Sequence, residues 1–216
     1  MTAEFLRDEV LGARGIPHGF GLRTSPEIAL RRPRQVHGAR VVWACARESE
    51  LGEADAVLTR ERGARVGVLT ADCVPILVAA GDVVGAVHAG WRGLAAGVIE
   101  SALAELSQSA PRAEISAAIG PCIGACCYEV DAPVLAPLRA RYGRLFDAAV
   151  TRSQGERAQL DLGALAQLVL ARGGVAPRAI GIAARACTRC DAARFHSFRR
   201  NGAAAGRLAH WIEAAS

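Results

Sequence analysis

Short apolar runs separated by turn residues recur along the chain, which is the pattern of β-strands. The clearest pair is 76–80 and 83–87, joined by the turn dipeptide Gly81-Asp82. So short a connection predicts an antiparallel hairpin. Further strands are expected at 41–44, 56–59, 66–70, 115–119 and 180–184.

Apolar residues spaced three and four apart predict helices instead at 92–108, 131–150 and 161–172. Asp161 stands where the last of these needs an N-cap, and Gly173-Gly174 would end it. The polar stretch 151–159 is predicted to be a loop. Hairpins argue against a purely parallel sheet. We therefore expect an α/β fold: a single layered domain over residues 1–216 with mixed, largely antiparallel sheets flanked by helices.

The charge of the chain comes from one kind of cation, since all 26 basic residues are arginine. The absence of lysine excludes Schiff-base, pyridoxal phosphate and Walker-type lysine chemistry. The net charge is +5, but the arginines are dispersed, aromatic content is 5% and no nucleic-acid motif is present. We expect no nucleic-acid partner. The guanidinium groups suit phosphate and other anionic substrates instead.

Targeting signals are not evident in the sequence. No window holds 18 uninterrupted apolar residues, and the first residues lack the basic and apolar regions of a signal peptide. We therefore expect no membrane association and a cytoplasmic location. Seven cysteines, an odd number, without a signal peptide argue against a disulfide framework.

Candidate chemistry lies at the open end of the expected hairpin, where Cys73 precedes one strand and His88 ends the other. Such a pair can be a buried thiol beside a structural histidine, a Cys–His nucleophilic dyad, or two metal ligands. His37 stands at the mouth of another apolar run. Together the three residues form a His₂Cys set, the ligand count of a catalytic zinc site with one open position.

Five segments now carry a family resemblance. QVHG, LTADCVPIL, AVHAGWRG, IGPCIGACCYEV and FHSFRRNG…GR resemble, in order, the motifs of the purine nucleoside phosphorylase/laccase-domain family. That family was formerly labelled polyphenol oxidase, and some members are called peptidoglycan editing factors. The match covers about residues 15 to 212. It implies zinc held by His37, Cys73 and His88.

The resemblance also implies an activity. Adenosine, inosine or methylthioadenosine would react with phosphate to give the base and ribose 1-phosphate, and adenosine would be deaminated by water. Purine nucleosides and phosphate are thus the expected partners, and zinc the expected cofactor, with copper as the alternative. A monomer or a small homo-oligomer is expected.

Substrate contacts are assigned to four residues: Gln35, Arg92, Arg199 and Arg200. The helix expected to begin at 92 would bring free backbone N–H groups close to His88, which favours phosphate binding there. The two later arginines match the SxRRDG pattern of the family, although Asn201 replaces its acid. Asp72 and Glu129 are the candidates for general acid or base.

The chain departs from the family between residues 21 and 34, where a helix and a loop of relatives are missing. We expect a more open pocket as a result. The nearby Arg31, Arg32 and Arg34 are interpreted as a solvated face. Asp55 is interpreted as a turn at a strand edge.

The remaining cysteines are interpreted without a metal. Cys122, Cys126 and Cys127 do not have zinc-ribbon spacing, so we expect them to pack or to line the site. Cys187-x-x-Cys190 is taken as structural because no second CxxC completes a four-cysteine site.

Three other functions fit parts of the pattern. A cysteine hydrolase would use Cys73 and His88 without a metal. A phenol oxidase would hold copper at the His₂Cys set, although five histidines leave no room for a multicopper cluster. A non-catalytic cell-wall editing partner would keep the fold without turnover.

Overall fold

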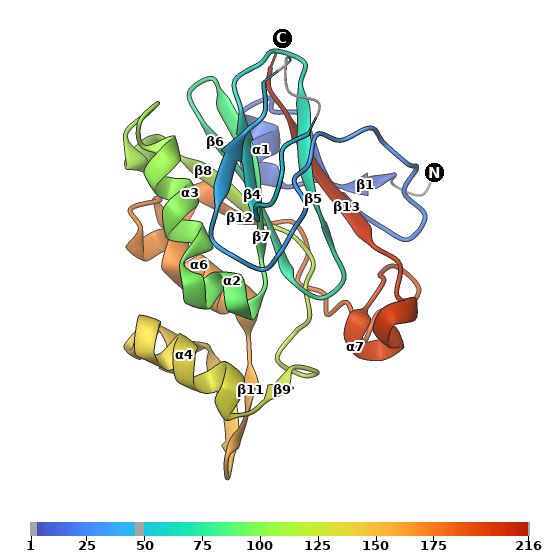
Figure 1. Ribbon diagram of the computed structural model, residues 1–216, viewed down its shortest axis with the longest axis vertical. Helices are drawn as coiled ribbons and strands as arrows, with labels where there is room; N and C mark the ends of the chain where they lie inside the picture. The colour runs from blue at the N-terminus through green and yellow to red at the C-terminus, as the bar shows by residue number, and fades with distance from the viewer. Residues whose placement is uncertain (1–3, 46–49, 216) are drawn as a thin grey trace.

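The computed structural model of the protein describes residues 4–45 and 50–215. Its centre is a six-stranded sheet with the order β12-β8-β6-β7-β4-β3 (Figure 1). Neighbouring strands run antiparallel except the outer pairs β12–β8 and β3–β4. The strands are β3 (Val41–Trp43), β4 (Ala56–Thr59), β6 (Val74–Ala80), β7 (Val83–Ala89), β8 (Ser116–Ile119) and β12 (Ile180–Ile182).

A second sheet packs against one face of the central sheet. Its order is β1-β2-β13-β5, and all of its pairs are antiparallel. The strands are β1 (Phe5–Leu6), β2 (His18–Gly21), β5 (Arg65–Thr70) and β13 (Leu208–Glu213). The short helix α1 (Glu9–Ala13) lies against β8 and β12.

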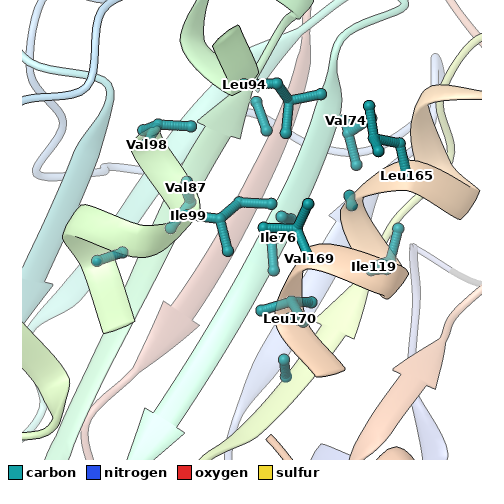
Figure 2. Close-up of a cluster of buried hydrophobic side chains, with 14 of the residues drawn as sticks. Val74, Ile76, Val87, Leu94, Val98, Ile99, Ile119, Leu165, Val169 and Leu170 are labelled. Atoms are coloured by element: carbon teal, nitrogen blue, oxygen red, sulfur yellow. The ribbon is translucent and has the colours of Figure 1, made fainter. Parts of the chain in front are cut away.

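Helices cover the other face of the central sheet, chiefly α3 (Val98–Leu106) and α6 (Leu162–Arg172). Figure 2 shows Ile76 and Val87 of the sheet beneath Ile99 and Val169 of these helices. Successive residues of β6 alternate between the two layers: Ile76 and Val78 belong to the helix side, whereas Leu77 and Ala79 face the second sheet. Burial on both faces explains why this strand is a continuous apolar run.

A smaller sheet projects from one end of the molecule (Figure 1). It contains β9 (Glu129–Val130), β10 (Val150–Gln154) and β11 (Arg157–Leu160), beside α4 (Ala132–Tyr142) and α5 (Arg144–Ala149). The loop predicted for 151–159 is therefore wrong. These residues form a hairpin that turns at Gly155, which has φ +59°. Because β10 is exposed along nearly its whole length, it lacks the apolar alternation that marks a strand.

Two of the predicted helices are each interrupted by a glycine. The stretch 92–108 divides at Gly97, which has φ +93°, into α2 (Trp91–Ala96) and α3. The stretch 131–150 divides at Gly143, which has φ +51°, into α4 and α5. Glycine adopts left-handed backbone freely, and one such residue ends a helix. The single continuous helices that we predicted are wrong at these points.

The other predicted elements are confirmed to within a few residues. The hairpin of 76–80 and 83–87 is the pair β6–β7, and the helix at 161–172 is α6, with the Asp161 side chain accepting from the Ala164 backbone N–H at 2.8 Å. The mixed, largely antiparallel α/β architecture is confirmed. The charged stretch 47–53 is expected from the sequence to be a loop, and part of it falls within residues 46–49, which lie outside the described residues. None of the helices in the described residues has the length and apolar character needed to cross a membrane.

The remaining elements are short. They are the helix α7 (Phe198–Asn201) and the 3₁₀ turns η1 (Arg112–Glu114), η2 (Pro177–Ala179) and η3 (Gly202–Ala204). Ser197 caps α7 by accepting a hydrogen bond from the backbone N–H of Arg200 at 3.2 Å. This places the FHSFRRNG segment at the lower end of the second sheet (Figure 1).

Candidate metal centre and cleft

Three segments bring His37, Cys73 and His88 together. One nitrogen of each imidazole and the thiol sulfur all lie within 4.8 Å of one another. Cys73 Sγ is 3.9 Å from His37 Nε2, and the two imidazole rings meet edge to face at 4.8 Å between centroids. The hairpin register explains the meeting, since Pro75 pairs with His88 at the end of β6–β7. The expected proximity of the three side chains is confirmed.

Asp55 positions His88 through its imidazole and His37 through its backbone. Its side chain is fully buried, and Oδ1 accepts hydrogen bonds from His88 Nδ1 at 2.7 Å and from the His37 backbone N–H at 2.9 Å. Oδ2 accepts from the backbone N–H groups of Gly38 and Val36 at 2.7 and 3.2 Å. These bonds hold His37 in a left-handed conformation, φ +61°. The interpretation of Asp55 as a mere strand-edge turn is wrong.

The same contact decides which nitrogen of His88 is available. Because Nδ1 donates to the Asp55 carboxylate, Nε2 is the nitrogen left to bind a ligand. Gly90 closes the other side: a Cβ atom there would lie 3.0 Å from Cys73 Sγ and 3.0 Å from His37 Cδ2. The glycine therefore leaves the room that the three side chains need.

The electrostatics of the cluster favour a thiolate. Burial raises the pKa of the Cys73 thiol, but hydrogen bonds and positive charge from His37 and His88 outweigh burial and lower it to about 6. Burial lowers the pKa of His88, yet its bonds to Asp55 and Cys73 raise it to about 9. Burial likewise raises the pKa of Asp55, but the His88 and backbone hydrogen bonds bring it below its usual value. Both shifts favour a thiolate–imidazolium pair, from which a metal ion that binds the cluster would displace the proton on His88 Nε2.

Asp72 is part of the cleft lining, and it also braces the segment next to Cys73. It has φ +90°, and its carboxylate accepts hydrogen bonds from Thr188 Oγ1 at 2.6 Å, Ser197 Oγ at 3.0 Å and the Arg199 backbone N–H at 2.6 Å. These bonds tie the segment before α7 to the residue next to Cys73. The other acid–base candidate, Glu129, pairs with Arg157 at 3.0 Å on the smaller sheet.

A cleft with a cavity volume of about 1310 Å³ opens over the cluster. His37, Cys73 and His88 lie in its lining, and six arginines share that lining: Arg31, Arg32, Arg34, Arg92, Arg199 and Arg207. The first three were interpreted as a solvated face, whereas the structure places them on the cleft wall. Arg31 pairs with Glu61 at 3.3 Å, and Arg34 pairs with Glu53. The cleft is thus rich in cationic side chains, as an anionic substrate requires.

Of the four residues assigned to substrate, three line the cleft: Gln35, Arg92 and Arg199. The Gln35 amide is occupied by the Leu69 backbone, with which it exchanges two hydrogen bonds of 2.8 Å. Arg92 Cζ lies 4.3 Å from the Trp91 ring centroid. The helix expected to begin near Arg92 does begin there, at Trp91 with Gly90 as its N-cap, but α2 has only six residues.

Arg200 is not brought into the cleft. Its guanidinium donates to the backbone carbonyls of Thr188, Arg189 and Phe195 at 2.9, 2.8 and 2.7 Å. Its Nε donates to Asn201 Oδ1 at 3.0 Å, so the amide takes the place of the family's acid. Arg200 therefore fixes the shape of the loop that precedes α7.

Aromatic side chains also line the cleft, and one of them, Phe198, was not singled out from the sequence. Trp91, Tyr128 and Phe198 line it, and the Phe198 side chain is 53% exposed. Arg199 Cζ lies 5.0 Å from the Tyr128 ring centroid. The phenylalanine directly before the arginine pair was the sequence signal that could have marked a ring-binding surface.

A second group of thiols lies outside this lining. Cys126, Cys127, Cys187 and Cys190 place their sulfur atoms within 4.8 Å of one another. The sequence argument that no second CxxC completes a four-cysteine set is therefore wrong, because the adjacent pair 126–127 supplies the other two thiols. Cys122 is not part of this group. Burial and neighbouring negative charge raise the pKa of its thiol far above the usual range.

Comparison with known proteins places the chain in a family. The family model described as multi-copper polyphenol oxidoreductase laccase matches residues 21–215. The protein named adenosine deaminase RL5, from an unknown prokaryotic organism, is 35% identical over 187 residues, which are 81% of this chain and 71% of that protein. The purine nucleoside phosphorylase PA4543 of Pseudomonas aeruginosa is 37% identical over 184 residues, 83% of this chain and 72% of the relative.

Two solved structures agree with these matches. The Neisseria meningitidis protein NMB0706 superimposes with a TM-score of 0.79 at 31% identity, covering 96% of this chain and 78% of that one. YlmD from Geobacillus stearothermophilus gives a TM-score of 0.77 at 30% identity, covering 86% and 74%. The chain belongs to the laccase-like family that its motifs indicated, among relatives named purine nucleoside phosphorylase and adenosine deaminase.

Proposed function

We propose that this protein is a zinc-dependent purine nucleoside phosphorylase that also deaminates adenosine. Adenosine, inosine or methylthioadenosine would react with phosphate to give the free base and ribose 1-phosphate. The observation that carries the proposal is the convergence of His37, Cys73 and His88 beneath a cleft lined by arginines. Relatives with both activity names support the same reaction class.

The donor set fits zinc. Zn²⁺ accepts imidazole nitrogen and thiolate sulfur, and three protein ligands leave a fourth position for water or substrate. Cys73 is already inclined to the thiolate form, and Asp55 fixes His88 with Nε2 available. A His₂Cys set also accepts copper, so metal analysis decides between the two ions. Bound zinc would supply a Lewis acid and lower the pKa of a bound water.

The chain itself would position the other reactants. Phosphorolysis forms a bond between a phosphate oxygen and the anomeric carbon while the bond to the base breaks. A phosphate must therefore be held near the sugar, and guanidinium groups such as Arg92 and Arg199 bind it through paired N–H donors. Phe198 and Trp91 offer ring faces against which a purine stacks.

A metal-independent cysteine hydrolase is the second candidate. Cys73, His88 and Asp55 form the sequence of contacts that activates a thiolate nucleophile, and the pKa of Cys73 is lowered to about 6. The two candidates use the same residues for different chemistry. Removal of metal therefore separates them, because only the zinc enzyme needs it.

The experiment compares wild type, Cys73→Ala and a matched control, Cys45→Ala, which removes an exposed cysteine outside both thiol clusters. Each protein is purified without added metal, its bound metal is measured, and adenosine is followed by chromatography with and without phosphate. Cys73→Ala is expected to lose about one equivalent of zinc per chain and at least about 100-fold in turnover. Cys45→Ala is expected to match wild type.

The products distinguish the activities and the rivals. Adenine that forms only with phosphate indicates phosphorolysis, and inosine that forms without phosphate indicates deamination. Turnover that survives complete removal of zinc by a chelator, but is lost on alkylation of Cys73, would overturn the proposal in favour of the hydrolase. Zinc without any purine product would favour a non-catalytic role.

A further inference from the structure

The second thiol cluster lies where two loops meet. Cys126 and Cys127 belong to the turn before β9, and Cys187 and Cys190 belong to the turn after β12. Cys126 and Cys190 are exposed, whereas Cys127 and Cys187 are half-buried. All four are free thiols, so no covalent bond accounts for their proximity.

The separations between the sulfur atoms match those around a tetrahedral metal. A Zn–S distance of about 2.3 Å implies an S–S edge of about 3.8 Å in a regular tetrahedron. The Cys126–Cys127 and Cys126–Cys190 sulfur separations are 3.8 and 3.7 Å. Cys127 and Cys190 are 3.2 Å apart, well beyond the roughly 2.05 Å of a disulfide bond. The cluster is thus already close to the size that a zinc ion requires.

The backbone around the cluster presents the four thiols from two tight turns. In the first turn, the N–H groups of Cys127 and Tyr128 both donate to the Gly124 carbonyl, at 3.0 and 3.1 Å. In the second, the Asp191 N–H donates to the Cys187 carbonyl at 3.0 Å. Gly124 also keeps space open, since a Cβ there would lie 3.4 Å from Cys126 Sγ and 3.7 Å from Cys187 Sγ.

A cation next to the cluster supports negatively charged sulfur. Arg189 Nη1 lies 3.5 Å from Cys127 Sγ. Four thiolates around one Zn²⁺ carry a net charge of −2, which a neighbouring guanidinium stabilises. Arg189 comes from the same CxxC turn as two of the ligands, so the turn supplies both the thiols and the counter-charge.

We infer that Cys126, Cys127, Cys187 and Cys190 form a second, structural zinc site, separate from the His₂Cys centre. Binding replaces the thiol protons, which pass to solvent, by four Zn–S bonds. With four protein ligands the site is closed to substrate, which is the hallmark of a structural rather than a catalytic ion.

The site would stabilise the wall of the cleft. The first turn leads directly to Tyr128, which lines the cleft, and the second contains Thr188, which donates to Asp72 next to Cys73. A parallel bridge between Cys122 and Cys187 joins the same two turns through their backbones. One ion would therefore hold the turns that position Tyr128 and Asp72.

The test measures metal per chain by elemental analysis in wild type, Cys190→Ser, Cys73→Ala and the control Cys45→Ser. Wild type and the control should hold about two zinc ions, and each of the other two variants about one. Each variant removes a ligand from only one site, so the two sites are tested separately. Loss of zinc from Cys190→Ser would therefore support the four-cysteine site even if the His₂Cys centre binds no zinc. The inference would be overturned if Cys190→Ser held as much zinc per chain as wild type.

Two measurements do not depend on the folding of Cys190→Ser. Cobalt loaded into Cys73→Ala should give the intense ligand-field and thiolate charge-transfer absorption of a tetrahedral four-sulfur site. Thiols counted in anaerobically purified wild type, denatured with a chelator, should number seven. Five thiols, which would mean a disulfide between two of the four cysteines, would overturn the inference, as would an octahedral cobalt spectrum.

Discussion

Asp55 shows how much of the site depends on one carboxylate that does not line the cleft. It is fully buried, and it accepts four hydrogen bonds that fix His88, His37 and the loop between Val36 and Gly38. A buried carboxylate is stable only when such partners satisfy it. Its bonds to the His88 imidazole and the His37 backbone make it a positioning residue for the metal centre.

Substitution of Asp55 by Asn tests this role. The amide retains an acceptor for the backbone N–H groups, but it removes the negative charge that holds His88 Nδ1–H. Zinc affinity of the His₂Cys centre should fall by about 10- to 100-fold, as for other carboxylates that orient a ligating histidine. Competition with a chromophoric chelator measures this affinity.

The matched control is Asp82→Asn, the same change at an exposed position in the turn at the far end of the β6–β7 hairpin. Its zinc affinity should equal that of wild type. Equal affinities in all three proteins would show that Asp55 serves the loop and not the metal ligands.

Phe198 gives a second prediction at this scale, concerning the nucleoside. Its ring is largely exposed in the cleft, and stacking of a base on an aromatic side chain contributes about 1–3 kcal/mol. Phe198→Ala should therefore raise KM for adenosine by about 10-fold or more, with a smaller effect on kcat, in steady-state kinetics. Phe198→Tyr keeps a ring and should restore KM, whereas an unchanged KM in the alanine variant would place the base elsewhere.

At the scale of elements, strands and helices could be predicted from the sequence where their burial produces a regular pattern of apolar residues. β6 and β7 are buried throughout, so their apolar runs marked the strands and their short turn set the register that joins Cys73 to His88. The exposed β10 has no such period, and its strand was missed. The helix broken at Gly97 has helical spacing on both sides, so periodicity alone did not reveal the break.

The candidate site divides in the same way. His37, Cys73 and His88 were predictable because a hairpin and motifs of known order connect them. Contacts across distant segments were not predictable. The four-cysteine cluster joins residues more than sixty positions apart, and the hydrogen bonds of Asp72 to Thr188 and Ser197 span more than a hundred. No local pattern records such contacts, which arise only when the layers pack.

The glycine between α2 and α3, Gly97, gives a testable prediction about stability. Alanine there would adopt φ +93°, and its Cβ would lie 2.0 Å from Arg141 Nη2. The left-handed backbone alone costs a side chain about 1–2 kcal/mol, and Arg141 must also leave its contact with Glu100. Gly97→Ala should lower the free energy of unfolding by at least that amount in urea titrations.

Gly12→Ala is the control for Gly97→Ala. Gly12 lies in α1, has no positive φ, and a Cβ there would meet nothing within 4 Å. Alanine in such a helix position stabilises by about 0.5–1 kcal/mol. Equal changes in the two variants would show that the junction of α2 and α3 has no special need for glycine.

At the scale of the whole molecule, a histidine is enclosed between the two main layers. His210 of β13 is fully buried, with its ring 5.7 Å from that of Phe20. Nδ1 accepts from the Gly21 backbone N–H at 3.3 Å, so Nε2–H donates to Thr70 Oγ1 at 2.8 Å. Burial and the nearby charge of His88 lower the pKa of His210 to about 3. The packed layers therefore hold this imidazole neutral.

This burial makes global stability depend on pH. In the unfolded chain a histidine titrates near 6.5, so between about pH 6.5 and 3 the unfolded state binds a proton that the native state does not. The contribution of neutral His210 is complete above pH 6.5 and is lost as the pH falls, at up to about 1.4 kcal/mol per pH unit. His210→Gln should therefore make the free energy of unfolding fall less steeply as the pH is lowered, because the substituted side chain binds no proton in either state.

Urea titrations between pH 7 and pH 4 measure the slopes of wild type and His210→Gln, and His196→Gln serves as the control because that ring is only half-buried. Protonation of the metal ligands and of the other carboxylates affects all three proteins alike, so the difference between slopes isolates one histidine. Burial and nearby arginines lower the pKa of His196 as well, so both variants should be flatter than wild type and His210→Gln the flatter of the two. Parallel slopes in all three would mean that the native protein admits the proton to His210, and hence that the two sheets separate more readily than the full burial of this ring implies.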